Sequence, residues 1–453
     1  MGERVSVIRA NCFEVRGPWL AREALELELT ITDTNYRGSE AHFLRFDMYP
    51  LYAPSHPNRH HGFWDLPLKN LRDEHAAVVL NESGLLVRTK GGDTSFPAVW
   101  KGSLAFKGYC ILHVSLWKTS RWQQPTQLET AFAKFVILPD GEDLSLSHIT
   151  IPVTQRCNLT CPMCMRHSAG KFEAVDIPTE VLDPLIEASR HVHSAMLVGI
   201  GEPLLYSNCC GIIGILKQRM PPQSQVGLTT NGILLNKEIA GKLIALGTDW
   251  ICFSLDGATS ATAEKVRPGL NFERVLENAS FLSRHRKALQ SNTPWLTANY
   301  VMTEENVHEM PAFMDLAASL GLDAVTFSHL NQYPAGRFAL LDESMLLSSF
   351  QQVKELGKKH GIIVLLPLAR PHSEPWCYFM ESPYVWMSGE VVPCCHMLDG
   401  AKPEPTKKFG NVTRTPLLEI WNSPEYRAFR RQVLEGDLPD ECGGCSYSVH
   451  TIE

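Results

Sequence analysis

The chain of 453 residues lacks the features that would tie it to a membrane or to nucleic acid. It has no apolar run approaching the roughly 18 residues that a transmembrane helix needs. Its start, "MGERVSVIRA", lacks the charged-then-apolar pattern of a signal peptide. The formal net charge is −7, from 42 Lys and Arg against 49 Asp and Glu, and no long basic run is present. These absences argue against membrane and nucleic-acid partners and predict a cytoplasmic protein.

Cysteine, in contrast, is plentiful and clustered, with 13 residues in all. Cys157, Cys161 and Cys164 form a C-x3-C-x2-C pattern in "CNLTCPMC", and five more follow near the C-terminus: Cys377, Cys394, Cys395, Cys442 and Cys445. Without an export signal, such clusters indicate metal ligands rather than disulfides. An iron–sulfur cube has four irons and takes thiolate ligands, so three thiols leave one iron open for a substrate or cosubstrate.

The hydrophobic pattern predicts three domains. Residues 1–144 alternate apolar and polar residues in short runs such as "ALELELTITDT", which predicts a β-rich antiparallel sandwich of roughly seven strands, and this region resembles immunoglobulin-like sandwiches. Residues 145–341 alternate six apolar strands with helix-like runs, which predicts a parallel sheet curled into a partial (β/α)6 barrel. Residues 342–453 begin with a helix and a strand and continue into a cysteine-rich tail, which predicts a small iron–sulfur domain.

Distinct motifs follow the first five predicted barrel strands. They are, in order, "CNLTCPMC", "VGIGEPLL", "TTNGILL", "SLDG" and "ANYVMTEEN". In parallel sheets the carboxyl ends of the strands carry the active site, so these motifs are expected to meet there. Their order and spacing resemble the radical S-adenosylmethionine (radical SAM) enzymes over about residues 147–330.

The resemblance implies that Cys157, Cys161 and Cys164 hold a [4Fe–4S] cluster whose open iron binds S-adenosylmethionine. It further implies contacts to this cosubstrate from Gly201, Glu202, Pro203, Thr230, Asn231, Ser254, Asp256, Asn299 and Val301. The implied reaction is reductive cleavage to a 5′-deoxyadenosyl radical, which abstracts hydrogen from a C–H bond, with an electron donor such as flavodoxin or ferredoxin. Two alternatives remain open: a structural zinc site with His167 as fourth ligand, and a non-enzymatic iron–sulfur scaffold.

The C-terminal pattern runs from Cys377 through Gly389 to Cys394, then through "FGNV" and "LLEIWNS" to "CGGC". It resembles the SPASM/twitch extensions of radical SAM enzymes. Because only "SYSVHTIE" follows Cys445, the resemblance implies one auxiliary [4Fe–4S] cluster, held by Cys377, Cys394, Cys442 and Cys445. Cys395 or His396 in place of Cys394, and a zinc ribbon on the same four ligands, remain alternatives.

Two substrate classes fit the sequence. The N-terminal region does not resemble the leader-binding module of peptide-modifying relatives and faintly resembles carbohydrate-associated sandwiches. This favours a polyhydroxylated small molecule (sugar or aminocyclitol) that undergoes dehydrogenation, dehydration or epimerisation. Maturation of a ribosomally synthesised peptide is the alternative. His329, Asn331 and Tyr333, which follow the sixth strand in "SHLNQYP", are predicted to point into the cavity, the alternative being surface-loop residues.

Overall fold

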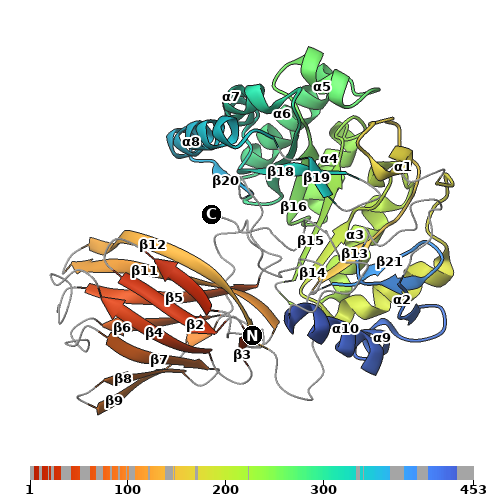
Figure 1. Ribbon diagram of the computed structural model, residues 1–453. Helices are drawn as coiled ribbons and strands as arrows, with labels where there is room; N and C mark the ends of the chain where they lie inside the picture. The colour runs from red at the N-terminus through yellow and green to blue at the C-terminus, as the bar shows by residue number, and fades with distance from the viewer. Residues whose placement is uncertain are drawn as a thin grey trace. The chain divides into compact units, whose positions relative to one another are not determined.

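A computed structural model describes the strands within residues 5–137 and then residues 146, 148–168, 172–222, 224–332, 337–339, 341–367, 382–394 and 407–435. The chain divides into two compact units, Met1–Ser145 and Leu146–Glu453 (Figure 1). Within the described ranges, no helix has the length and apolar character needed to cross a membrane.

The first unit is built from β-strands, as predicted. One six-stranded sheet has the order β1 (Val5–Arg9), β2 (Phe13–Pro18), β4 (Leu25–Ile31), β7 (His75–Asn81), β8 (Gly84–Thr89) and β9 (Gly92–Pro97). The other has the order β10 (Val99–Trp100), β6 (Gly62–Pro67), β5 (His42–Pro50), β11 (Gly108–Ser120), β12 (Gln123–Ile137) and β3 (Leu20–Ala21). The expected number of about seven strands is therefore wrong, because short strands such as "GDTSFP" lack the apolar alternation that reveals a strand in sequence.

The second unit contains the predicted partial barrel. All six predicted strands are confirmed and pair in parallel in chain order: β13 (His148–Ile151), β14 (Ser194–Leu197), β15 (Gln225–Thr230), β16 (Trp250–Ser254), β17 (Trp295–Met302) and β18 (Ala324–Gln332). A further strand, β20 (Ile363–Leu365), extends the sheet parallel to β18, and β19 (Arg337–Ala339) pairs with the end of β18 in the antiparallel sense. The sheet thus grows past the six predicted strands without closing.

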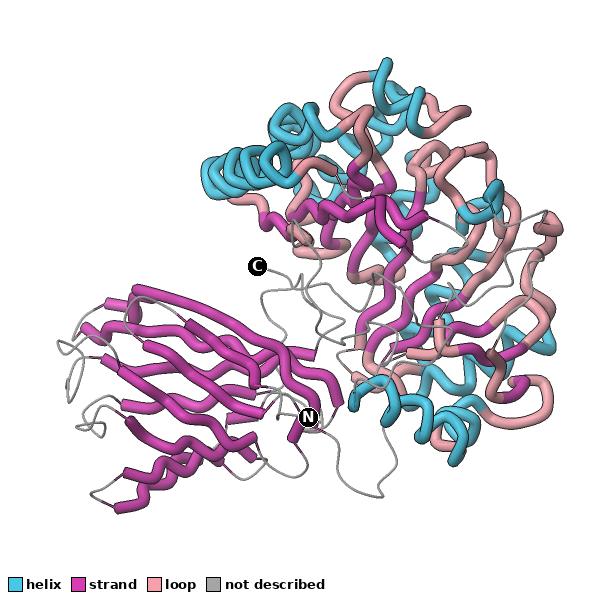
Figure 2. The backbone as a smooth tube through the Cα atoms, in the orientation of Figure 1, coloured by secondary structure: helices cyan, strands magenta, loops and turns pink. Residues whose placement is uncertain are grey.

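Helices lie along the outer side of this sheet (Figures 1 and 2). They are α2 (Thr179–Ala188), α3 (Cys209–Arg219), α4 (Lys237–Ala245), α5 (Ser260–Val266), α6 (Phe272–Ala288), α7 (Met310–Leu320) and α8 (Glu343–His360). The short helix α1 (Met165–Ser168) belongs instead to the loop after β13. Four begin with a side chain that accepts a backbone N–H in the first turn: Asn236, Thr259, Asn271 and Asp342. Helices α7 and α8 end at Gly321 and Gly361, whose φ values of 70° and 68° favour glycine.

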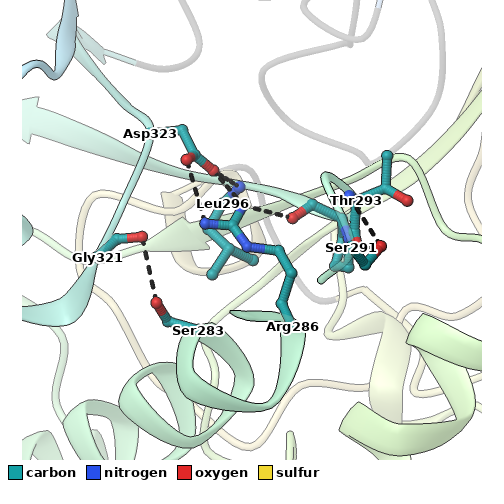
Figure 3. A network of polar contacts seen from close by, with 8 residues as sticks. Ser283, Arg286, Ser291, Thr293, Leu296, Gly321 and Asp323 are labelled. Carbon is teal, nitrogen blue, oxygen red and sulfur yellow. Dashed lines mark hydrogen bonds and ion pairs between the residues drawn. The ribbon is translucent and has the colours of Figure 1, made fainter. Parts of the chain in front are cut away.

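A polar network fixes the amino ends of β17 and β18 (Figure 3). Asp323, just before β18, accepts the backbone N–H of Leu296 in β17 at 2.7 Å. It also pairs with Arg286 of α6 at 2.5 and 3.2 Å, and Arg286 donates to the carbonyl of Pro294 at 2.9 Å. Since Arg286 is only 7% exposed, this ion pair joins two strands and a helix inside the protein.

The C-terminal part forms a small three-stranded antiparallel sheet of β21 (Tyr384–Val385), β22 (Glu390–Val392) and β23 (Gly410–Asn411), followed by α9 (Leu417–Trp421) and α10 (Pro424–Glu435). Strand β21 contacts β13, and α9 contacts α2 (Figure 1). The core of this C-terminal part is aromatic. The rings of Phe409 and Tyr426 stack with their centroids 4.0 Å apart, and the Arg430 guanidinium carbon lies 3.9 Å from the centroid of the Trp421 ring. The small sheet therefore packs on the barrel edge that carries the cysteine loop.

Candidate active site

The three loop cysteines follow β13, as predicted. Cys161 is buried, Cys157 and Cys164 are half-buried, and none of them forms a disulfide. The loop is shaped by its own backbone: the Leu159 N–H points at Cys157 Sγ (3.5 Å), and the Cys164 N–H donates to the Cys161 carbonyl at 3.0 Å. The chain thus gathers three thiols in one short loop.

The three thiols interact with one another electrostatically, because Cys157 and Cys164 each raise the pKa of Cys161. As a donor set, three thiolates fit a [4Fe–4S] cluster, in which each thiolate binds a different iron, whereas a structural zinc ion usually takes four ligands.

Burial raises the pKa of two of these thiols. It raises the pKa of Cys161 to about 11, with Arg267 acting in the opposite direction, and it also raises the pKa of Cys157. Metal ligation requires thiolates, so binding of iron must release protons here. Burial thus favours the neutral thiol form of Cys157 and Cys161 over the thiolate, and metal ligation must offset this preference.

The "GIGEP" motif after β14 packs closely against the backbone that leads from β13 into the cysteine loop. A Cβ on Gly201 would lie 2.3 Å from the Thr154 carbonyl oxygen, so only glycine fits this close approach. The Glu202 N–H donates to the Arg156 carbonyl at 2.8 Å. Arg156 in turn pairs with Asp176 at 2.7 Å. A backbone hydrogen bond thus connects the motif to the residue directly before Cys157.

Glu202 and the "TTNG" motif meet, as the resemblance implied. Glu202 is 2% exposed, and its carboxylate accepts bonds from the Thr230 hydroxyl at 2.6 Å and the Asn231 N–H at 2.8 Å. Burial raises the pKa of Glu202, while these two bonds and one from the Leu204 N–H lower it. The Asn231 amide then donates to the side chain of Asn158, inside the cysteine loop, at 2.8 Å. Three predicted motifs therefore form one network.

Strand alternation separates the two faces of the barrel sheet. Tyr300 and Phe327 pack against Phe313 of α7, so their face is the helix side. Asn299 and Ser254 have the opposite parity and lie side by side in register, and the Asn299 side chain accepts a bond from Ser328 at 3.0 Å. The predicted cosubstrate residues Ser254, Asn299 and Val301 consequently share the inner face.

Asp256 is fully engaged within the protein. Its side chain is 0% exposed; one oxygen accepts the Val301 N–H at 2.8 Å, and the other pairs with Arg267 at 2.7 Å. The loop behind it is held by Glu309, which accepts bonds from the N–H groups of Ala258 and Thr259. Sequence reasoning missed Arg267 and Glu309: the "RPG" of "KVRPGL" marks a turn, but nothing in the sequence shows where the turn packs.

The structure differs from the expectation for one proposed substrate residue. His329 is 5% exposed and shares strand parity with Phe327, which faces α7. Side chains alternate between the two faces of a strand, so His329 lies on the helix side and does not point toward the inner face of the sheet. Tyr333 lies outside the described residues, and only the backbone of Asn331 is described. Those two stay predictions.

Among the predicted auxiliary ligands, Cys394 is half-buried just after β22. Cys377, Cys442 and Cys445, with the alternatives Cys395 and His396, lie outside the described residues. The same hairpin reaches the barrel loop: the ring of Trp386 stacks on Phe172 at 6.2 Å, and Met165 packs against the same apolar cluster. The hairpin that precedes Cys394 thus packs on the segment that follows the barrel cysteine loop.

Comparison with protein-family models gives two matches. Residues 151–317 match the radical SAM superfamily, and residues 377–446 match the SPASM iron–sulfur cluster-binding domain. The first range contains the cysteine loop, Glu202, Ser254 and Asn299; the second contains all five C-terminal cysteines.

The chain is also similar to curated proteins and to a solved structure. A tungsten-containing aldehyde ferredoxin oxidoreductase cofactor-modifying protein of Pyrococcus furiosus is 27% identical over 66% of this chain and 87% of its own. A PqqA peptide cyclase of Gluconobacter oxydans is 28% identical over 65% of this chain and 80% of its own. The crystal structure of anSMEcpe with bound AdoMet superposes with a TM-score of 0.51 at 18% identity, covering 67% of this chain and 84% of that one. The last match shows a shared fold.

Proposed function

This chain is a radical SAM enzyme with a C-terminal SPASM-type domain, and we propose that its substrate is a polyhydroxylated small molecule, a sugar or aminocyclitol. The chemistry that a [4Fe–4S] cluster and S-adenosylmethionine supply when bound is one-electron cleavage to a 5′-deoxyadenosyl radical, which takes hydrogen from a C–H bond. Dehydrogenation, dehydration or epimerisation of the substrate would follow.

The observation that carries the substrate proposal is the all-β first unit. Every described element of Met1–Ser145 is a strand, in two six-stranded sheets. A leader-binding module of the kind expected in peptide-modifying relatives combines a winged helix with a small sheet, and the described strands offer no counterpart to that helix. Larger sheets of this kind suit a domain appended to an enzyme of small-molecule metabolism, by fold-level analogy.

The relatives support both substrate classes. The relative from Pyrococcus furiosus is named as modifying a cofactor, which favours a small molecule. The relative from Gluconobacter oxydans is named as a peptide cyclase, and it keeps peptide maturation as the second candidate function. The two are almost equally similar to this chain, at 27% and 28% identity, so similarity alone does not decide between them.

The residues take distinct roles in the proposal. Cys157, Cys161 and Cys164 would hold the barrel cluster. Glu202, linked to Thr230 and Asn231, would bind the amino group of S-adenosylmethionine, and the inner-face residues Ser254, Asn299 and Val301 would line its nucleoside part, with Gly201, Pro203 and Asp256 shaping the site. Because one cubane takes four thiolates, Cys377, Cys394, Cys442 and Cys445 would hold one auxiliary [4Fe–4S] cluster. A reducing cytoplasm with flavodoxin or ferredoxin would supply the electron.

Deuterium transfer tests the substrate class. The reconstituted enzyme is incubated with S-adenosylmethionine, dithionite and C-deuterated sugars, nucleotide sugars and aminocyclitols, and 5′-deoxyadenosine is analysed by mass spectrometry. Deuterium in 5′-deoxyadenosine from one of these compounds supports the proposal. Deuterium arriving only from a peptide encoded beside the gene overturns it and establishes peptide maturation.

A further inference from the structure

The turn after α5, which lies outside the predicted motifs, packs against the cysteine loop. After α5, the carbonyl of Pro268 accepts the backbone N–H of Thr160 at 3.1 Å and its hydroxyl at 3.4 Å. Next to it, a Cβ on Gly269 would lie 3.3 Å from the Asn158 carbonyl and 3.4 Å from the Leu159 side chain. Asn158, Leu159 and Thr160 are the three residues between the first two loop cysteines. The turn therefore packs directly on the loop that holds the cluster.

Arg267, at the start of this turn, carries a buried charge. Its side chain is 13% exposed and pairs through Nε with Asp256 at 2.7 Å. Burial alone would lower the pKa of Arg267, but Asp256 and then Cys161 more than offset that effect and raise it. A guanidinium stays protonated in proteins, so a fixed positive charge stands beside the loop.

The backbone places this charge beside the cysteine loop. Arg267 directly precedes Pro268, whose carbonyl accepts the N–H of Thr160, the residue before Cys161. The charge of Arg267 can therefore interact with charge on the loop, and the charge of Asp256 opposes it. Inside a protein such interactions are much less screened than in water.

We propose that Arg267 is the buried cation that sets the reduction potential of the cluster held by Cys157, Cys161 and Cys164, with Asp256 partly offsetting its charge. A cubane bound by three thiolates is already anionic, and the electron taken from the donor makes it more so. A nearby cation stabilises the reduced form more than the oxidised form, and net charge is one of the determinants of cluster potential. Arg267 is on this account a tuning residue and need not touch the cosubstrate.

An EPR-monitored redox titration of the reconstituted full chain, without S-adenosylmethionine, tests this. The barrel-cluster signal is identified as the one absent from the C157A/C161A/C164A variant. Arg267→Gln should shift its potential to more negative values, with at least a tenfold lower ratio of reduced to oxidised cluster at a fixed ambient potential, equivalent to about 59 mV for one electron. Asp256→Asn, which leaves the cation uncompensated, should shift the potential in the opposite direction, and Arg267→Lys should stay close to wild type.

Arg286→Gln is the matched control. Arg286 is also buried and also paired with an aspartate, but at the amino ends of the strands. It should leave the potential unchanged. If Arg267→Gln does not fold, D256N/R267Q removes both charges together and should have a lower potential than Asp256→Asn alone. Equal potentials for wild type, Asp256→Asn and D256N/R267Q at full iron content would overturn the proposal, as would an equal shift in Arg286→Gln.

Discussion

Two Arg–Asp ion pairs, each with one buried member, lie at opposite ends of the same barrel sheet. Arg286 and Asp323 join α6 to the amino ends of β17 and β18 (Figure 3). Arg267 and Asp256 lie past the carboxyl end of β16, where the turn after α5 packs on the cysteine loop. Each aspartate also accepts a backbone N–H of β17, from Leu296 and Val301 respectively.

The chemistry of the two pairs is the same, so their positions decide what they do. In parallel sheets the amino ends of the strands contribute stability and the carboxyl ends carry function. Arg286 and Asp323 bind backbone groups of the strands and so stabilise the fold. Arg267, in contrast, lies beside the cysteine loop. The same type of ion pair thus stabilises the sheet at one end and places a positive charge near the thiols at the other.

The largest expected effect is the loss of the barrel cluster when the three loop cysteines are removed. The C157A/C161A/C164A variant should bind about four irons where wild type binds about eight, as one and two cubanes require. Iron and acid-labile sulfide analysis of anaerobically reconstituted protein measures this. A wild-type content near four irons with one equivalent of zinc would contradict a SPASM-type auxiliary cluster and favour the zinc ribbon.

Removing the charge at the amino end should cost stability and leave the chemistry intact. Arg286→Gln leaves Asp323 without its cation and should lower the free energy of unfolding by about 3 kcal/mol, the range for breaking a buried ion pair. Denaturant unfolding of the apoprotein measures the loss. A variant with wild-type stability, or one with an altered cluster signal, would erase the distinction between the two ends.

Changing the charge of Glu202 should affect cosubstrate binding more than folding. Glu202→Gln keeps the shape but loses the charge, and charge-assisted hydrogen bonds contribute about 2 kcal/mol, so the KM for S-adenosylmethionine should rise about 30-fold. The exposed Glu238, which pairs only with Lys242, provides the control Glu238→Gln. An unchanged KM in Glu202→Gln would show that the buried network of Thr230 and Asn231 is purely structural.

The amino end should also show a pH dependence of its own. Burial lowers the pKa of His148, which bonds Ser194 across β13 and β14, to about 4. The unfolded chain takes up the proton near the ordinary pKa of 6.5, so stability falls as the pH drops from there toward 4. Between pH 6.5 and 5 the loss should be about 1.5 kcal/mol, absent in His148→Gln. Unfolding curves at both pH values check the difference.

The carboxyl end of the barrel was largely predictable from sequence because its residues come in motifs tied to strand ends. The cysteine loop, Glu202, Thr230 and Asn231 were placed together correctly because strand order brings successive strand ends to one edge. Arg267 was not found, because its contacts with Asp256 and the cysteine loop depend on how a turn packs. The sequence does not reveal which face of β18 carries His329, because a difference of one residue in the alternation reverses the face.

The cysteine loop carries the central claim, that reductive cleavage of S-adenosylmethionine takes place at the carboxyl end of the barrel. The most direct measurement is the amount of 5′-deoxyadenosine formed by the reconstituted enzyme with dithionite under anaerobic conditions. Wild type should form it, Arg286→Gln should still form it at a temperature where it is folded, and C157A/C161A/C164A should form none while keeping its auxiliary cluster. No 5′-deoxyadenosine from wild-type protein with a full complement of iron, or an equal amount from the triple variant, would contradict the account.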